Sequence, residues 1–319
     1  MSILYENEYG YFISHEVYIN KLYSGMQRPL QINPKLFAIN RPYKSLKDQS
    51  KLKRKCEVLR DQTENKDALE AAKEIYDRSG ISPVDDFNGA NIGRATIKNV
   101  YGYNFVFPQN SIFFCKDVSD MKTHLKDNKY DLILLDPPWW NKYIRRKRKK
   151  LGDGVAYKML FNDDVKSLPV ETLLKGNGMV VIWCTNSQQH MHDLLTEILP
   201  KWGVKYLGTW YWIKITLTGE TVCTFSLPPG KQPYEQIIFG CRASCPIKFD
   251  TKLIVSIPSA VHSHKPPLVE LLKQFLPENP SCLEVFARYL LPNWTSYGNE
   301  VLRLQHESLF IDAQNNNGV

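Results

Sequence analysis

The chain has 319 residues and a formal net charge of +8, and 43% of its residues are hydrophobic. This composition suffices to bury a core and excludes a wholly disordered chain. The longest apolar runs, such as 178–184, are far shorter than the roughly 18 residues that span a bilayer. The amino terminus has no basic stretch followed by an apolar one, so we expect no secretory signal.

Residues 1–44 combine aromatic side chains with three prolines, and we expect irregular structure with short strands there. The charged stretch Ser45–Ser79 carries an interrupted apolar stripe, which predicts one or two helices. Asp85–Gly93 is typical of a loop, so we place a boundary beside it. The expected division is an N-terminal segment with a packing or binding role, a main domain and a flexible tail, over residues 1–92, 93–312 and 313–319.

From about residue 96, apolar segments of strand length alternate with helical patterns. The predicted strands are Tyr103–Phe107, Ile112–Cys115, Leu132–Leu135, Met179–Cys184, Val204–Ile215, Glu235–Phe239, Leu253–Ser256, Cys282–Phe286 and Glu300–Arg303. The predicted helices are Asp164–Leu174, Ser187–Leu199 and Pro266–Leu276. This alternation favours an α/β fold, built on a doubly wound and mostly parallel sheet with helices on both faces.

The seven cysteines include no Cys-x-x-Cys pair, which is typical of free thiols in a reducing compartment. Cys241 and Cys245 are followed by His262 and His264, so a zinc site is an alternative. Structural zinc sites usually have tighter paired spacings, and we interpret these cysteines as small buried side chains.

The loop Asp136-Pro137-Pro138-Trp139 directly follows a run of buried aliphatic residues. Ligands of open α/β sheets bind beyond the carboxyl ends of the strands, where this loop would lie. The two prolines remove backbone donors and leave carbonyl acceptors. We expect a planar ring with an exocyclic amine, whose hydrogens the carboxylate and a proline carbonyl accept while Trp139 stacks on the ring. A rigid turn with a buried tryptophan is the structural alternative.

Several blocks along the chain, in order, resemble one family. They are Asp136–Trp139, Trp210–Lys214, Lys231–Glu235, His262–Pro267, Leu283–Arg288 and Asn293–Glu300. Together they are similar to the S-adenosylmethionine-dependent N6-adenine methyltransferases of the messenger-RNA adenosine methyltransferase superfamily, methyltransferase-like protein 4 branch. The resemblance covers roughly 100–310 and implies a circularly permuted Rossmann-like methyltransferase fold, with Asp136 preceding Glu284.

The resemblance also implies the cofactor, S-adenosylmethionine, and its contacts, with no metal. Lys265 would meet the methionyl carboxylate, with Asp136 near the methionyl amine. The other implied contacts are Asp117 and Val118 at the adenine, and Glu284, Phe286, Arg288, Asn299 and Glu300 around the ribose. A solvated Lys265 and a structural Glu284–Arg288 ion pair are the alternatives. The chain departs from the messenger-RNA enzyme at Leu290 and Leu291, where that enzyme has polar cofactor contacts.

A basic tract directly follows the catalytic loop. Between residues 142 and 150 it has seven basic residues and no acid, which leaves +1 for the rest of the chain. They are Lys142, Arg145, Arg146, Lys147, Arg148, Lys149 and Lys150. We expect this tract to contact phosphates, although a solvated loop or a nuclear localisation signal would look the same. The other expected substrate contacts are Trp140, Tyr157, Trp212, Lys214 and Glu235. We expect Trp140, Trp210 and Trp212 to stack on unpaired bases, with packing in a strand as the alternative for the last two.

The expected function is therefore adenine-N6 methylation of RNA by a nuclear monomer, with the cytoplasm as an additional location and no membrane association. For this branch the resemblance implies 2′-O-methyladenosine in U2 spliceosomal small nuclear RNA as the target. DNA adenine, a catalytically inert RNA-binding partner and a small-molecule amine methyltransferase are the alternatives. The inert partner is disfavoured because the chain keeps Asp136–Trp139, Lys265 and Asn299. The small-molecule enzyme is disfavoured because of the basic tract.

Overall fold

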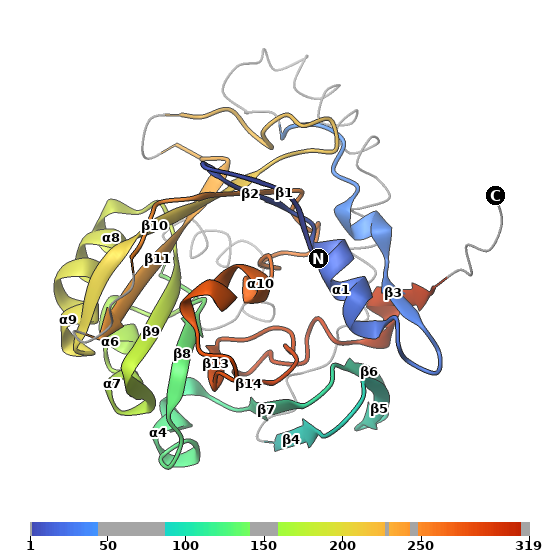
Figure 1. Ribbon diagram of the computed structural model, residues 1–319, viewed down its shortest axis with the longest axis horizontal. Helices are drawn as coiled ribbons and strands as arrows, with labels where there is room; N and C mark the ends of the chain where they lie inside the picture. Colours follow the sequence, from blue (N-terminus) through green and yellow to red (C-terminus); the bar gives the residue numbers. More distant parts are fainter. Residues whose placement is uncertain (1, 44–86, 141–158, 227–229, 243–247, 314–319) are drawn as a thin grey trace, which may run out of the picture.

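A computed structural model describes residues 2–43, 87–140, 159–226, 230–242 and 248–313. A single large sheet dominates these residues (Figure 1). In sheet order its strands are β1 (Ile3–Asn7), β2 (Gly10–Ile13), β12 (Leu253–Ser256), β10 (Val204–Lys214), β11 (Tyr234–Arg242), β9 (Leu174–Cys184), β8 (Tyr130–Leu135), β13 (Cys282–Val285), β14 (Trp294–Tyr297), β7 (Ser111–Cys115) and β4 (Phe87–Asn91). Two smaller antiparallel pairs join β3 (Leu30–Ile32) to β15 (Phe310–Asp312), and β5 (Thr96–Val100) to β6 (Tyr103–Phe107).

The expected α/β class with a mostly parallel sheet is confirmed. Within the described residues, six neighbouring strand pairs of the large sheet are parallel and four are antiparallel. Every residue of β8 is buried, as its continuous aliphatic run predicts for a central parallel strand. Its side chains enter two core clusters, one on each face of the sheet.

The helices are short and lie on both faces of the sheet. Figure 1 shows α6 to α9 together outside the curved sheet, with α10 within its curve and α1 beside β3. The helices are α1 (His15–Tyr23), α4 (Met121–His124), α6 (Asn162–Lys166), α7 (Val170–Leu173), α8 (Gln188–Asp193), α9 (Leu199–Lys201) and α10 (Val269–Leu272). Single 3-10 turns occupy Pro34–Phe37, Val118–Asp120, Lys273–Phe275 and Glu307–Leu309, and Leu194–Ile198 is π-helical.

Two local predictions are wrong. Glu300–Arg303 forms a turn, and the strand lies earlier, at β14, inside the Asn293–Glu300 block. Asp85–Gly93 contains the strand β4, which pairs with β7. Gly89 looked like a loop residue, but a Cβ on it would lie 2.9 Å from the Phe113 ring, so glycine lets that ring pack against the strand. The predicted helices of Ser45–Ser79 lie outside the described residues.

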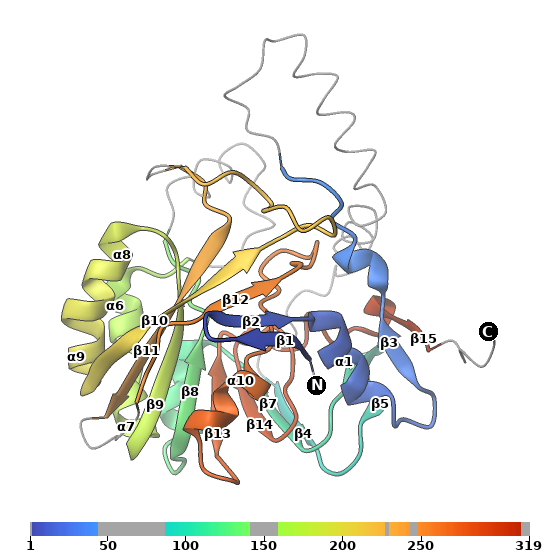
Figure 2. The same cartoon turned by 45° about the horizontal axis from the view of Figure 1, so that its top comes forward.

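The large sheet runs across the boundary that we placed at residue 92. Strand β2 pairs in parallel with β12, and β4 pairs with β7 (Figure 2). Helix α1 begins after Ser14, whose hydroxyl accepts the Val17 N–H at 3.1 Å. The described parts of residues 1–92 thus supply strands to the same sheet as the main domain.

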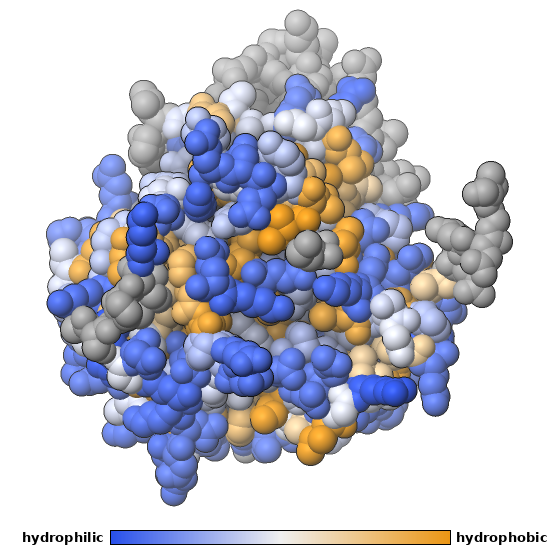
Figure 3. Space-filling view, in the orientation of Figure 1, coloured by the Kyte–Doolittle hydropathy of each residue, from blue (hydrophilic) through white to orange (hydrophobic). Residues whose placement is uncertain are grey.

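The face seen in Figure 3 is largely hydrophilic, with apolar side chains gathered near its middle. Exposed large apolar residues include Leu4, Val17 and Leu253, from β1, α1 and β12. Among the described residues, no helix has the length and apolar character needed to cross a membrane.

Candidate active site

The sheet reverses its winding between β8 and β13. After β8 the next strand of the large sheet is β9, on one side, whereas after β13 it is β14, on the other. Such a switch point leaves a crevice beyond the carboxyl ends of the two strands. Asp136 directly follows β8 and Phe286 directly follows β13. The turns after β14 and β7, which carry Asn299 and Asp117, end at the same edge.

The loop after β8 is held by backbone hydrogen bonds. The Asp136 N–H donates to the Val285 carbonyl at 3.3 Å, and the Leu160 N–H donates to the Pro138 carbonyl at 2.9 Å. The Trp139 N–H donates to the Pro137 carbonyl at 2.8 Å. The Pro137 oxygen therefore already accepts one bond, and an amine hydrogen would use its second lone pair.

Trp139 is anchored in the core and is only 6% exposed. Its indole N–H donates to the Trp183 carbonyl at 2.8 Å, and its ring centroid lies 5.2 Å from that of His190. Trp140 stacks on Phe161, with ring centroids 5.8 Å apart, and Phe161 is 59% exposed. Trp139 therefore forms a fixed wall of the site, and Trp140 and Phe161 lie beside it.

Seven charged side chains form a continuous chain of ion pairs with alternating sign. In order they are Lys214, Glu235, Lys265, Asp136, Arg288, Glu300 and Arg303. Asp136 lies at its centre, 3.5 Å from Lys265 Nζ and 3.0 Å from Arg288 Nη1. Arg288 Nε also contacts a Glu300 oxygen at 3.1 Å. Each carboxylate in this charge chain bridges two cations, and four of the cofactor contacts implied by the resemblance, Asp136, Lys265, Arg288 and Glu300, belong to it.

The network shifts the pKa values of its members. Burial alone would raise the pKa of Glu235, but Lys265 and Lys214 outweigh burial and lower it to about 2. Burial alone would lower the pKa of Lys265, yet the negative charges of Asp136 and Glu235 raise it above its ordinary value. Glu235 is therefore a stable anion and Lys265 a stable cation near neutral pH.

Glu284 differs from the carboxylates of the charge chain. It is 6% exposed, and its Oε2 atom has no hydrogen-bond partner among the described residues. Burial and the nearby charge of Asp136 raise its pKa to about 8, although Arg288 opposes the shift. The raised pKa favours the protonated form of Glu284, and the ion pairs of Arg288 go to Asp136 and Glu300.

Several features suit a nucleoside ligand with a zwitterionic tail. Lys265 and Asp136 place a cation beside an anion, which matches a carboxylate and an ammonium group on one carbon. Phe286 has a left-handed backbone with φ of 63°, a strained conformation often found at ligand sites. Asn299 is exposed after β14, and the Asp117 side chain accepts the Ser119 N–H at 2.9 Å, just before Val118–Asp120.

The structure does not place every predicted residue on a binding surface. Trp210 and Trp212 are 1% and 2% exposed, and their indole N–H groups donate to Asp250 and Ser256, so the prediction that they stack on bases is wrong. They point into the core because alternate residues of β10 face it. Lys142, Arg145–Lys150 and Tyr157 lie outside the described residues. Leu290 and Leu291 are buried in the core, which explains their apolar character.

Sequence reasoning missed two residues that hold the loop. Trp183, at the end of the buried strand β9, accepts the Trp139 indole N–H through its carbonyl. His190 has one ring nitrogen 2.9 Å from the Trp140 carbonyl and the other 2.7 Å from Asn162 Oδ1. Neither lies in a recognisable motif, and only the place of Trp183 at the end of β9 and of His190 in the helix after it could have indicated them. Of the zinc candidates, Cys241 is buried in β11, and Cys245 lies outside the described residues.

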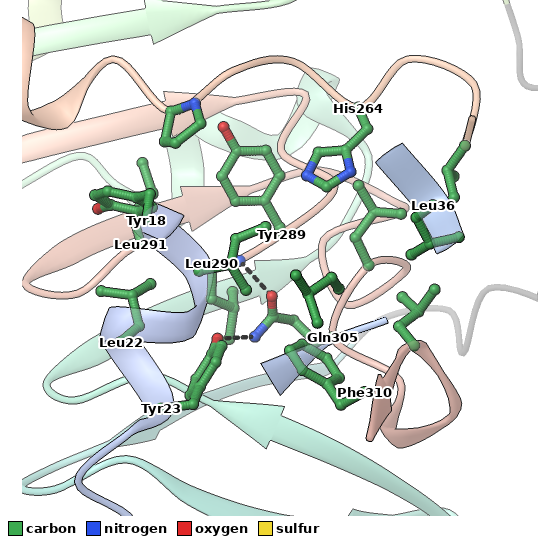
Figure 4. Close-up of a pocket in the computed structure, with 16 residues that line it drawn as sticks. Tyr18, Leu22, Tyr23, Leu36, His264, Tyr289, Leu290, Leu291, Gln305 and Phe310 are labelled. Carbon is green, nitrogen blue, oxygen red and sulfur yellow. Dashed lines mark hydrogen bonds between the residues drawn. The ribbon is translucent and has the colours of Figure 1, made fainter. Parts of the chain in front are cut away.

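A small cavity of about 20 Å³ lies behind the segment that carries Lys265 (Figure 4). Tyr18, His264 and Tyr289 line one part of it, and Gln305 bonds Tyr23 and the Leu290 N–H in another. Its volume suits about one water molecule, and its walls are mostly apolar. The cavity is therefore too small for a nucleoside.

Several known proteins are similar in sequence to this chain. The mouse protein named N(6)-adenine-specific methyltransferase METTL4 is 38% identical over 223 residues, which are 66% of this chain and 46% of that protein. A Caenorhabditis elegans protein named DNA N6-methyl methyltransferase is 34% identical over 219 residues, 67% of this chain and 58% of that protein. A Pyricularia oryzae protein named N6-methyladenosine RNA methyltransferase MTA1 is 33% identical over 224 residues, 66% of this chain and 57% of that protein. The chain thus spans about half the length of these relatives.

The family model described as MT-A70 matches residues 130–300, which is more than half of the chain. The match begins with β8 and ends at Glu300, so it contains both sides of the switch point, the loop at Asp136 and Lys265. The chain therefore belongs to the MT-A70 family, within which it is similar to the METTL4 branch.

Proposed function

We propose that the chain transfers a methyl group from S-adenosylmethionine to the N6 nitrogen of adenine in RNA. The observation that carries this proposal is the position of Asp136, at the sheet's switch point and between Lys265 and Arg288. Membership of the MT-A70 family supports the reaction class. The names of three relatives, each an N6-methyltransferase, support adenine as the target.

When bound, S-adenosylmethionine supplies a methyl group on a positively charged sulfur. Lys265 would hold the methionyl carboxylate, and Asp136 would lie near the methionyl amine. Glu300 and Asn299 would contact the ribose from the turn after β14, and Asp117 would face the adenine from the turn after β7. Arg288 orients both Asp136 and Glu300, because one guanidinium contacts both carboxylates.

The protein's own part in the reaction is to position the acceptor amine. The Asp136 carboxylate and the Pro137 carbonyl accept hydrogen bonds from the N6 amine, which localises its lone pair on nitrogen and directs it to the methyl carbon. The new N–C bond would replace the S–C bond of the bound cofactor, whose electron pair would stay on the sulfur. One N6 proton would then leave, with the Asp136 carboxylate as its acceptor.

The basic tract and the names of the relatives both support a nucleic-acid substrate. The basic tract of residues 142–150 follows the catalytic loop directly in the chain, and phosphates are its natural ligands. One relative is named an RNA enzyme and another a DNA enzyme. We propose RNA, and 2′-O-methyladenosine of U2 small nuclear RNA as the specific target, together with a nuclear location for the monomer.

Methyl transfer from labelled S-adenosylmethionine tests the proposal, with structured RNA, its 2′-O-methylated form and matched DNA as substrates. Nucleoside mass spectrometry should find N6-methylated adenosine with the 2′-O-methylated RNA as the preferred substrate, and Asp136→Asn should abolish turnover. Circular dichroism should show that the variant keeps its fold. If Asp136→Asn turned over at nearly the wild-type rate, the assignment of the active site would be wrong. If the enzyme preferred DNA, the proposed RNA substrate would be wrong.

A further inference from the structure

The two lysines that form ion pairs with Glu235 each lie over an indole ring. Lys214 Nζ lies 4.5 Å from the centroid of the Trp212 ring, and Lys265 Nζ lies 5.2 Å from that of Trp183. The two rings are in edge contact, with centroids 5.6 Å apart at 74°. Both lysines also bond the Glu235 carboxylate. The two indoles therefore stabilise the positions of Lys214 and Lys265 in the charge chain, because an ammonium is attracted to the face of an indole.

The Trp212 ring is in turn held by a residue of α1. The Trp212 indole N–H donates to Ser256 Oγ at 2.8 Å, and His15 Nε2 lies 2.9 Å from the same oxygen. His15 is 1% exposed, Ser256 has no exposed surface, and the His15 and Trp212 rings lie 5.9 Å apart. Because both groups are buried, water cannot replace either partner, and loss of this bond would leave Ser256 Oγ with one partner fewer.

Helix α1 also packs against the segment that carries Lys265. The rings of His15 and His264 are 5.8 Å apart in an edge contact, and His264 immediately precedes Lys265. Figure 4 shows His264 with Tyr18 of α1 among the residues that line the cavity. Burial lowers the pKa of His264 to about 4 and that of His15 well below its ordinary value, so neither adds a positive charge near Lys265.

We propose that His15 is a positioning residue for the active site, which acts through Ser256 and Trp212 on Lys214, Glu235 and Lys265. The residue lies outside the stretch 130–300 that the family model matches. The inference rests on the proposed function, because Lys265 is the residue assigned to the methionyl carboxylate. It gives the N-terminal segment a part in cofactor binding besides its strands in the sheet.

The test compares His15→Leu and Ser256→Ala with His15→Gln, which can restore the bond to Ser256. Tyr18→Phe is the matched control, because Tyr18 is buried on the same helix and its hydroxyl has no partner among the described residues. Calorimetry with S-adenosylhomocysteine and steady-state kinetics should show a Kd and a cofactor KM raised about 3- to 10-fold in His15→Leu and Ser256→Ala. kcat should stay within about 2-fold, and His15→Gln and Tyr18→Phe should resemble the wild type.

A purely structural role would instead lower the active fraction, and so kcat, with the cofactor affinity unchanged. That result, or equal loss in Tyr18→Phe, would overturn the proposal. A nitrogen-15 spectrum of the seven tryptophan indoles, with Trp212→Phe for assignment, gives a readout without turnover. The Trp212 indole signal should move in His15→Leu, and an unmoved signal would refute the link even in an active enzyme. If the signal moves but the wild type binds no S-adenosylhomocysteine, the proposed function fails and the structural link stands.

Discussion

Replacing Glu284 by glutamine should change how the stability of the protein depends on pH. The side chain is 6% exposed, and burial together with Asp136 raises its pKa from 4.5 to about 8. Between these two values the folded protein holds a proton that the unfolded chain has released. The resulting stability is fully present below pH 4.5, falls as the pH rises, and is lost once the pH passes about 8.

The size of this loss of stability follows from the distance between the two pKa values of Glu284. Each pH unit between these values costs the wild type about 1.4 kcal/mol, and the whole interval costs at most about 5 kcal/mol. Glutamine has nearly the shape of a protonated glutamate and cannot ionise. The free energy of unfolding of Glu284→Gln should therefore rise relative to that of the wild type by about 3 kcal/mol between pH 5 and pH 7.

Urea unfolding of both proteins at pH 5, 6, 7 and 8, followed by circular dichroism, measures this difference. All other titrating groups are shared, so their contributions largely cancel in the comparison. The difference should rise steadily with pH and level off above about 8. A difference that stays constant from pH 5 to pH 8 would show that Glu284 ionises normally in the folded protein, and would refute the reasoning.

Three further predictions concern other parts of the site. Gly298→Ala should lower the free energy of unfolding, measured with urea, by about 1–3 kcal/mol. The reason is that Gly298 has a φ of +152° and that a Cβ there would lie 3.2 Å from backbone atoms of the turn after β13. Gly25→Ala is the control, because the space around Gly25 is open. Glu235→Gln should leave two lysines without their shared anion and lower kcat/KM by about 100-fold. The wild type should lose stability as Glu235 is protonated between pH 4.5 and about 2, and the variant should lack this loss in an acid-unfolding experiment. Replacing the basic residues of 142–150 by serine should weaken RNA binding and flatten its salt dependence, and an unchanged slope in a salt titration would leave only the localisation reading.

The buried aliphatic strands were predictable because their signal is local. The aliphatic run of β8 is buried along its whole length, and Leu253–Ser256 matches β12 at both ends. Strands with mixed composition were missed, since β4 is rich in asparagine and glycine and is stabilised by pairing with β7. Predicted helices were too long, as at Pro266–Leu276, where only Val269–Leu272 is α-helical.

The motifs of the chain were sufficient to place Asp136, Lys265, Arg288 and Glu300 in one family pattern, because residue type and order are all that such a pattern needs. Which charge meets which was decided by the tertiary structure, where distant strand ends converge at one edge and join these residues into the charge chain. The fold also decided that Trp212 faces the core, where it supports Lys214 instead of a base. A hydrogen bond such as that between His15 and Ser256, 241 residues apart in the sequence, leaves no local signal, because it exists only once the sheet has formed.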